Sequence, residues 1–99
     1  MYTPVHTKQF EKDIRRAKRR GKNLEKFKII ARTLLAGQAL DNIHRNHRLV
    51  GSYLGRRECH IESDWLLIYK MEEKRIIFER MGTHSDLNSA LAFSRTTGA

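Results

Sequence analysis

The chain has 99 residues, of which 39% are hydrophobic and 31% are charged. This length allows one domain with a modest core, leaves no room for a second domain within residues 1–99, and the hydrophobic content excludes a wholly disordered chain. Twenty Lys and Arg residues face eleven Asp and Glu residues, which gives a formal net charge of +9. A domain this basic is expected to bind a nucleic acid or an acidic protein, and the alternative is that its charge serves only solubility.

Cysteine use and hydropathy narrow the class of protein further. Cys59 is the only cysteine, which excludes an internal disulfide framework and a metal site built from several thiolates. A lone cysteine fits the reducing cytoplasm. No stretch approaches the ~18 apolar residues of a membrane span, and the N-terminus does not resemble a secretory signal. We therefore expect a cytoplasmic protein without a membrane segment.

The first third of the chain predicts a strand followed by two helices. Residues 2–6 can form a short strand, which Pro4 restricts to the edge of a sheet. A helix is predicted from Thr7, with apolar residues at helical spacing, as far as Gly21. Asn23 is a suitable N-cap for a second helix, which ends at a further glycine. The short connection predicts an antiparallel helix hairpin.

The remainder of the chain changes to the period of β-strands. Residues 37–52 show no period and are predicted to be a loop. Residues 53–61 alternate loosely, residues 65–71 form the apolar run WLLIYKM, and residues 75–81 complete a three-stranded meander. The apolar run is typical of a central strand that is buried on both faces.

The C-terminal segment predicts a short helix after the last strand. Thr83 or Ser85 can cap this helix, Leu87 and Ala90 would face inward, and residues from about 93 to 99 would fray. The element order is therefore β-α-α-β-β-β with a short final helix. This order predicts an α+β fold in which a helix hairpin packs on a mainly antiparallel sheet.

Polar residues are expected to gather at one end of the meander. His60 and Asp64 flank its first turn, whereas Arg80 and His84 lie at the end of its third strand. The third strand of a meander runs parallel to the first, so its C-terminal end returns to that turn. These residue types, with His47 in the preceding loop, suit RNA cleavage by the 2′-hydroxyl, which needs a base, an acid and a cation near the phosphate.

Each of these residues also has a structural interpretation. A histidine at a strand end is often a solvated surface residue, and Asp64 can form an Asx-turn. Trp65 begins an apolar strand, so it fits the core as well as an RNA-stacking platform. Arg80 can simply pair with Glu79 or Glu58.

A zinc site is a further alternative for the histidines. His47, His60, Asp64 and His84 are suitable ligand types, but their spacing matches no metal motif. We therefore expect the site to work without a metal or another cofactor.

These residues belong to a longer stretch that resembles a known protein family. The resemblance is detailed over residues 44–87 and looser over the two predicted helices. It is carried by His47, Leu49, Gly51, Gly55 and Arg57, followed by ECHIESDWLLIYK and FERMGTHSDL. These positions resemble the YafQ branch of the RelE/ParE toxin superfamily, whose pattern reads DH-x-L-x-G-x-W-x-G-x-R-x-x-H, then D-W-x-L-I-Y, then R-x-G-T-H. The resemblance implies the RelE-like microbial RNase fold.

The resemblance also implies an activity and partners. Toxins of this kind belong to bacterial type II toxin–antitoxin pairs, enter the ribosomal A site and cut the bound mRNA by metal-independent acid–base catalysis. The implied partners are a cognate acidic antitoxin, the ribosome and mRNA. Two alternatives are a ParE-like toxin, which blocks a topoisomerase by binding alone, and an inert rRNA-binding protein whose histidines are structural.

Roles carry over from the family onto single residues. His84 and His47 would share the proton transfers. His60 would hold the phosphate with Arg80 beside it, and Asp64 would orient a histidine or assist as the base. The expected RNA-contacting residues are Trp65, Arg57, Lys12, Arg15, Arg16 and Arg19.

Three positions depart from the family pattern. Tyr53 stands where Trp is usual, Asn46 replaces the common Asp before the loop histidine, and Asn88 replaces a frequent aromatic residue. The aromatic residue is expected to help position RNA, so the change at Asn88 bears on substrate preference.

Overall fold

The structure is a computed structural model that describes residues 1–51 and 54–87. Its elements are β1 (Thr3–His6), α1 (Lys8–Arg19), α2 (Leu24–Leu35), the 3₁₀ helix η1 (Asn42–His44), β2 (His47–Arg48), β3 (Arg56–Glu62), β4 (Trp65–Met71) and β5 (Arg75–Gly82). A further helical turn begins at His84, one residue after the end of β5.

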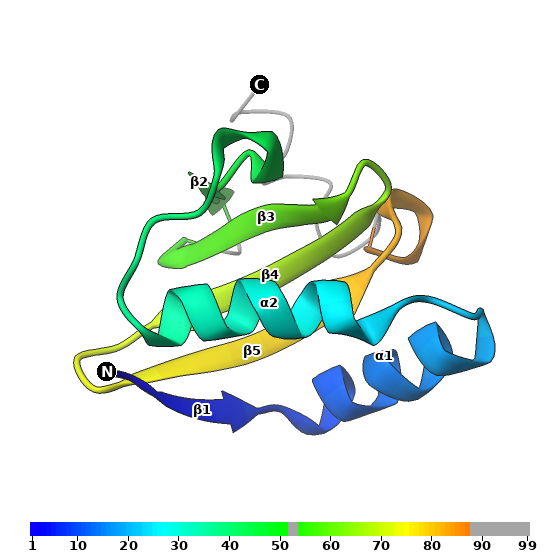
Figure 1. Cartoon of the computed structure of the whole chain (residues 1–99), viewed down its shortest axis with the longest axis horizontal. Helices are drawn as coiled ribbons and strands as arrows, with labels where there is room; N and C mark the ends of the chain where they lie inside the picture. Colours follow the sequence, from blue (N-terminus) through cyan, green and yellow to red (C-terminus); the bar gives the residue numbers. More distant parts are fainter. Residues whose placement is uncertain (52–53, 88–99) are drawn as a thin grey trace.

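The described strands form one five-stranded sheet in the order β1-β5-β4-β3-β2 (Figure 1). β1 runs parallel to β5, and the other neighbouring strands are antiparallel. α2 crosses one face of the sheet in front of β4 and β5, and α1 lies beside β5 beyond the end of β1 (Figure 1). The predicted α+β fold is therefore confirmed, with β1 at the edge as Pro4 requires.

Both helices begin and end close to the predicted positions, and Asn23 is the N-cap of α2 as predicted. Thr7 Oγ1 accepts a hydrogen bond from the backbone N–H of Phe10 at 3.0 Å, and Asn23 Oδ1 accepts one from Glu25 at 3.1 Å. Gly21 follows α1 with a φ of 74°, which an L side chain rarely adopts. Within residues 1–51 and 54–87, no helix is long and apolar enough to cross a membrane.

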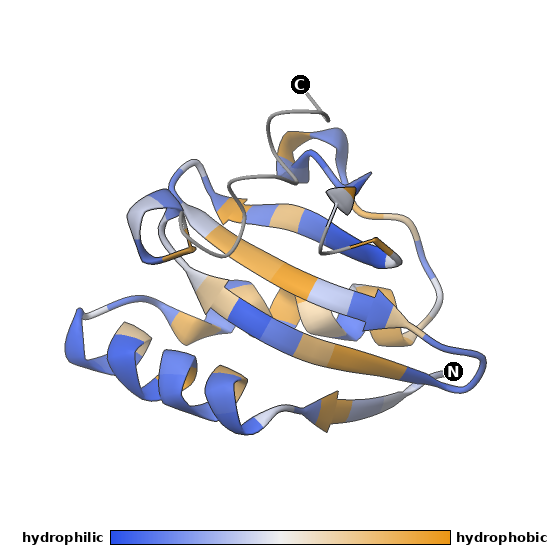
Figure 2. Ribbon diagram, turned by 180° about the vertical axis from the view of Figure 1, so that it is seen from behind, coloured by the Kyte–Doolittle hydropathy of each residue, from blue (hydrophilic) through white to orange (hydrophobic). Residues whose placement is uncertain are grey.

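The sheet separates two apolar clusters of different size. The larger cluster lies between the sheet and the helices, and its aromatic rings Phe10, Phe27 and Phe78 have centroids 5.5 to 5.8 Å apart. The smaller cluster consists of Leu49, Leu66, Ile68 and Leu87. β4 supplies residues to both clusters and is apolar along most of its length (Figure 2), so the prediction of a strand buried on both faces is confirmed. The face that carries the smaller cluster is called the open face below.

The predicted loop of residues 37–52 contains regular structure that the sequence did not indicate. η1 and β2 both lie within it, and β2 pairs with β3 through His47 opposite Glu58. Two residues are too few to show an alternation, so only the partner strand defines β2. β3 also begins later than expected, at Arg56, and position 53 lies outside the described residues.

The predicted C-terminal helix is confirmed at its start. Thr83 is its cap, because Thr83 Oγ1 accepts from the backbone N–H of Asp86 at 3.0 Å and Asp86 Oδ2 accepts from that of Thr83 at 2.9 Å. Leu87 is fully buried in the smaller cluster. Ala90 and the tail at 93–99 lie outside the described residues.

Candidate active site

The turn between β3 and β4 brings Asp64 against the helical turn that follows β5. His84 Nδ1 lies 2.5 Å from Asp64 Oδ1, and the backbone N–H of His84 donates to the same oxygen at 2.8 Å. These bonds, the backbone one foremost, hold the pKa of Asp64 below its ordinary value. An ionised carboxylate only accepts hydrogen bonds, so Nδ1 of His84 carries the proton and its Nε2 is left to exchange one with a substrate.

His60 lies beside this pair and close to a buried carboxylate. Its ring centroid is 5.8 Å from that of His84. Glu58 shares the open face with His60, because alternate residues of a strand point to the same side. His60 Nε2 is 3.9 Å and His47 Nε2 is 3.4 Å from Glu58 Oε1, and the Glu58 side chain is 0% exposed. Glu58 therefore lies between the two histidines.

His47 presents acceptors to both of its ring nitrogens. Its Nδ1 lies 2.7 Å from the carbonyl oxygen of Arg45, while its Nε2 faces Glu58. An imidazolium donates through both nitrogens, so this arrangement suits a histidine that gives up a proton. From the sequence, Glu58 was expected only as an alternative partner of Arg80. Its spacing of two residues from His60 places both side chains on one face of a strand, and this spacing could have indicated Glu58 as a site residue. The sequence does not indicate that His47 in β2 lies opposite Glu58.

The side chain of Arg80 leaves β5 on the open face, but its guanidinium is hydrogen-bonded to Asp13 of α1. In the sheet register Arg80 is opposite Ile68, whose side chain lies on the open face. Its Nε donates to Asp13 Oδ2 at 2.9 Å, and its Nη2 lies 3.4 Å from Asp13 Oδ1. Asp13 has a 0% exposed side chain and also accepts from the backbone N–H of Met81 at 2.9 Å. Arg80 is thus ion-paired with Asp13 of α1, a partner that the sequence did not indicate.

Trp65 faces the helices and is 1% exposed. Its ring offers no face to a nucleotide, so the expected RNA stacking does not match this placement. Lys22 Nζ lies 5.6 Å from the ring centroid, and Trp65 Nε1 is buried with no hydrogen-bond partner among the described residues. The physical reason is the start of β4, which places Trp65 on the larger cluster and Leu66 on the smaller one.

The basic residues of α1 divide into two groups. Lys12, Arg15 and Arg19 are exposed. Arg16 is partly buried, and its Nη2 contacts Asp13 Oδ1 at 3.2 Å. Arg16 was expected to contact RNA. Its guanidinium instead pairs with Asp13, because this side of α1 faces β5.

Neither the thiol of Cys59 nor a cluster of metal-ligating side chains adds to the candidate site among the described residues. Burial raises the pKa of the Cys59 thiol to about 12. Within residues 1–51 and 54–87, no group of three or more His, Cys, Asp and Glu side chains is placed to hold a metal ion.

Comparison with known proteins places the chain in a family. The family model described as the bacterial toxin of type II toxin–antitoxin systems, YafQ, matches residues 2–89. The chain belongs to the YafQ toxin family. It is 42% identical over 81 residues to the mRNA interferase toxin YafQ of Escherichia coli K12, covering 80% of this chain and 87% of that protein.

Solved YafQ structures share the fold. YafQ from E. coli BL21(DE3) superimposes with a TM-score of 0.83 at 35% identity, and the match covers 88% of this chain and 98% of that one. The E. coli DinJ–YafQ complex gives a TM-score of 0.82 at 36% identity, with the same two shares covered.

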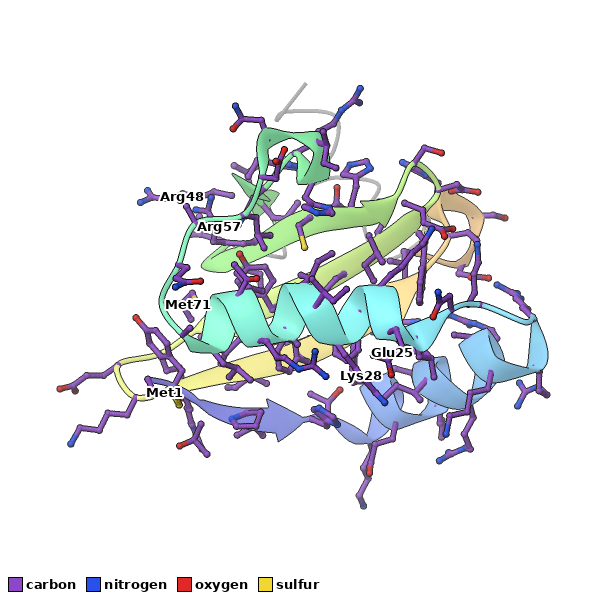
Figure 3. All side chains as sticks on the ribbon, viewed as in Figure 1. Met1, Glu25, Lys28, Arg48, Arg57 and Met71 are labelled. Atoms are coloured by element: carbon purple, nitrogen blue, oxygen red, sulfur yellow. The ribbon has the colours of Figure 1, made fainter. Side chains whose placement is uncertain are left out.

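Asn46 and Arg57, two positions of the YafQ pattern, are hydrogen-bonded to each other, and the Arg57 side chain lies away from the histidines of the site. Arg57 Nε donates to Asn46 Oδ1 at 2.9 Å, and Asn46 Nδ2 donates to the hydroxyl of Tyr69 at 2.7 Å. Arg57 is opposite Tyr69 in the register, on the helix side of the sheet and at the end of β3 away from Asp64 (Figure 3). Arg57 therefore does not join the histidines, and the remaining departures, at 53 and 88, lie outside the described residues.

Proposed function

We propose that this YafQ-family toxin cleaves mRNA on the ribosome by metal-independent acid–base catalysis. The observation that carries the proposal is the Asp64–His84 pair, with His60 at 5.8 Å from His84 between ring centroids. The E. coli relative is named an mRNA interferase, and this name supports the same activity here. His84 and His47 are exposed, so that RNA can reach both imidazoles.

The geometry supports a division of the proton transfers. His84 Nε2 takes the proton of the 2′-hydroxyl, because Asp64 holds its Nδ1 proton. The 2′-oxygen then bonds to phosphorus, and the bond from phosphorus to the 5′-oxygen breaks. His47 gives its proton to that leaving oxygen. The products are a 2′,3′-cyclic phosphate and a 5′-hydroxyl.

Positive charge is needed where the phosphate gains negative charge. His60 is next to His84 and supplies this charge when protonated. Arg80 adds a permanent charge on the neighbouring row of the sheet, and Asp13 holds its Nε and Nη2 in place. Asp64 acts by orienting His84 rather than by leaving its carboxylate free as a base.

A basic surface supports the ribosome as the place of action. Lys12, Arg15 and Arg19 are exposed on α1, where they can contact the phosphates of rRNA. The partner in the pair is an antitoxin, which we propose to be acidic because the toxin carries a net charge of +9. An E. coli YafQ has been solved in a DinJ–YafQ toxin–antitoxin complex. We place both proteins and the target in the cytoplasm.

The test is to express the toxin in cells and map mRNA 5′ ends. The wild type is expected to arrest growth and to produce new ends within translated codons, whereas His84→Gln is expected to do neither and still to bind the antitoxin. DNA damage without new mRNA ends would instead support a topoisomerase blocker. Growth without arrest would support an inert rRNA-binding protein.

A further inference from the structure

A set of ion pairs ties α1 to the helical turn that carries His84. Arg20 contacts both oxygens of Asp86, with Nη1 2.5 Å from Oδ2 and Nη2 3.1 Å from Oδ1. Arg16 Nη2 lies 3.6 Å from Asp86 Oδ2. The buried Asp13 holds Arg16 in turn, at 3.2 Å. Arg16 therefore connects Asp86 to a buried residue of α1, and Arg20 adds a second contact from the same helix.

Asp86 is also held by its own segment, where the backbone passes very close. Its Oδ2 accepts from the backbone N–H of Thr83 at 2.9 Å. A Cβ atom at Gly82 would lie 2.7 Å from Arg16 Nη2 and 2.9 Å from Asp86 Cβ. Glycine at position 82 thus gives α1 the room to reach Asp86. The turn is fixed at Thr83, at Asp86 and, through burial, at Leu87.

We propose that Asp86 is a positioning residue for His84 and that Arg20 acts through it. His84 and Asp86 are two residues apart on a helical turn, so their side chains point to different sides. The Asp86 side faces α1, and the His84 side faces Asp64 and His60. Fixing one side fixes the direction of the other. This inference rests on the proposed ribonuclease function, which supplies the reaction in which His84 takes part.

The network gives Arg20 a different role from the exposed basic residues of α1. Its guanidinium is paired with a carboxylate, and the hydrogen bond to Asp86 raises the pKa of Arg20. Arg20 therefore contributes chiefly to the geometry of His84. Its loss should change the rate of the bound complex, whereas loss of a free surface charge should change binding.

The test is a double-mutant cycle with Arg20→Ala, Asp86→Asn and both changes together. Asp86→Asn keeps an oxygen that can accept from Thr83 and removes only the charge. Lys18→Ala is the control, because it takes the same charge from α1 and has no carboxylate partner among the described residues. The readouts are the maximal rate of cleavage of ribosome-bound mRNA and the NMR signals of the His84 ring in the free toxin, assigned with His84→Gln.

Each single variant is expected to lower the maximal rate roughly tenfold, because the misplaced imidazole meets the 2′-hydroxyl less often in a reactive geometry. Asp86→Asn should leave the half-saturating ribosome concentration unchanged. The ring signals of His84 should shift in both variants and stay in place in Lys18→Ala. The double variant should be no slower than the slower single variant, since both remove one contact.

Two results would overturn the proposal. One is a set of His84 signals in Asp86→Asn and Arg20→Ala that match those of Lys18→Ala. The other is a rate that falls without any shift of these signals, which would mean that Arg20 contacts RNA directly. If the wild type cuts no mRNA, the proposed function fails, but the ring signals still decide whether Asp86 positions His84.

Discussion

At the scale of single residues, two carboxylates lie against the three histidines of the candidate site. Asp64 is exposed and binds the Nδ1 side of His84, whereas Glu58 is buried and lies between His47 and His60. A carboxylate between two imidazoles can accept a hydrogen bond from either ring, while a carboxylate on one nitrogen of an imidazole leaves the other nitrogen free. These two environments are the basis of the proposed division between His84 as the base and His47 as the acid.

Glu58→Gln is expected to lower the cleavage rate roughly tenfold with little change in fold, because the amide keeps the shape and loses the charge between the histidines. Single-turnover cleavage of ribosome-bound mRNA is the measurement. Glu62→Gln is the matched control on the same strand, since its carboxylate pairs with Lys22 and Lys26. Equal rates in the two variants would show that Glu58 has no part in the reaction.

Asp64 is expected to titrate below its ordinary pKa of 3.8, because the backbone and the ring of His84 both stabilise its ionised form. The folded-state pKa is lowered, so the stability from this contact is present above about pH 3.8 and is lost as the pH falls through the folded pKa. NMR titration of the Asp64 carboxyl carbon measures the midpoint. In His84→Ala the midpoint should rise part of the way, since the backbone donor remains. A wild-type midpoint at or above 3.8 would contradict this account.

At the scale of elements, the position of α1 decides where the arginines go. α1 packs along β5 beyond the end of β1 (Figure 1). This position allows Asp13 to bind Arg80, and Arg20 to bind Asp86. Thr7 fixes the start of the helix with two hydrogen bonds, because its hydroxyl accepts from Phe10 and donates to the carbonyl oxygen of Glu79 at 3.0 Å.

Thr7→Ala is expected to destabilise the fold by about 2 kcal/mol and Asn23→Ala by about 1 kcal/mol, because the first removes a cap and a contact to β5 and the second removes a cap alone. Urea unfolding followed by circular dichroism measures both. The order of the two losses is the decisive feature. A larger loss for Asn23→Ala would mean that the bond to Glu79 contributes nothing.

Some elements and contacts could be predicted from local sequence patterns, whereas others depend on how the elements pack. β4 and the two helices follow from local patterns: an apolar run, helical spacing, and caps at Thr7 and Asn23. The approach of His60, Asp64 and His84 follows from the topology of a meander. The bond from Asp13 to Arg80 spans 67 positions, and it depends on the packing of α1, which no local pattern contains. β2 could not be predicted either, because only its pairing with β3 defines it as a strand.

At the scale of the whole molecule, some basic side chains are ion-paired with carboxylates, whereas others are exposed to solvent. Arg16, Arg20 and Arg80 are paired with Asp13 and Asp86, while Lys12, Arg15 and Arg19 of α1 are exposed. Figure 2 shows α1 as hydrophilic along most of its ribbon, apart from the stripe that packs inward. The net charge of +9 is therefore presented in part by this helix.

Arg15→Ala is expected to weaken binding to the ribosome and to reduce the salt dependence of binding by about one unit of log–log slope, because it removes one phosphate contact. Binding titrations at several salt concentrations measure the slope. The maximal cleavage rate should stay as in the wild type. A slope equal to that of the wild type would exclude Arg15 from the contact.

Cys59 reports on the integrity of the sheet. Its thiol, with a pKa raised to about 12, is expected to resist alkylation at pH 8 in the folded toxin and to react at once in denaturant. Thiol titration with and without denaturant is the measurement. Rapid reaction of the folded toxin would show that β3 opens readily or that Cys59 is not buried.

The central claim is that the Asp64–His84 pair serves RNA cleavage on the ribosome. The most direct test incubates the purified toxin with programmed ribosomes and analyses the ends of the cut mRNA. The account predicts a cut at the A-site codon with 2′,3′-cyclic phosphate and 5′-hydroxyl ends, and its loss in His84→Gln. Cleavage at the wild-type rate by His84→Gln, or 5′-phosphate ends from the wild type, would contradict it.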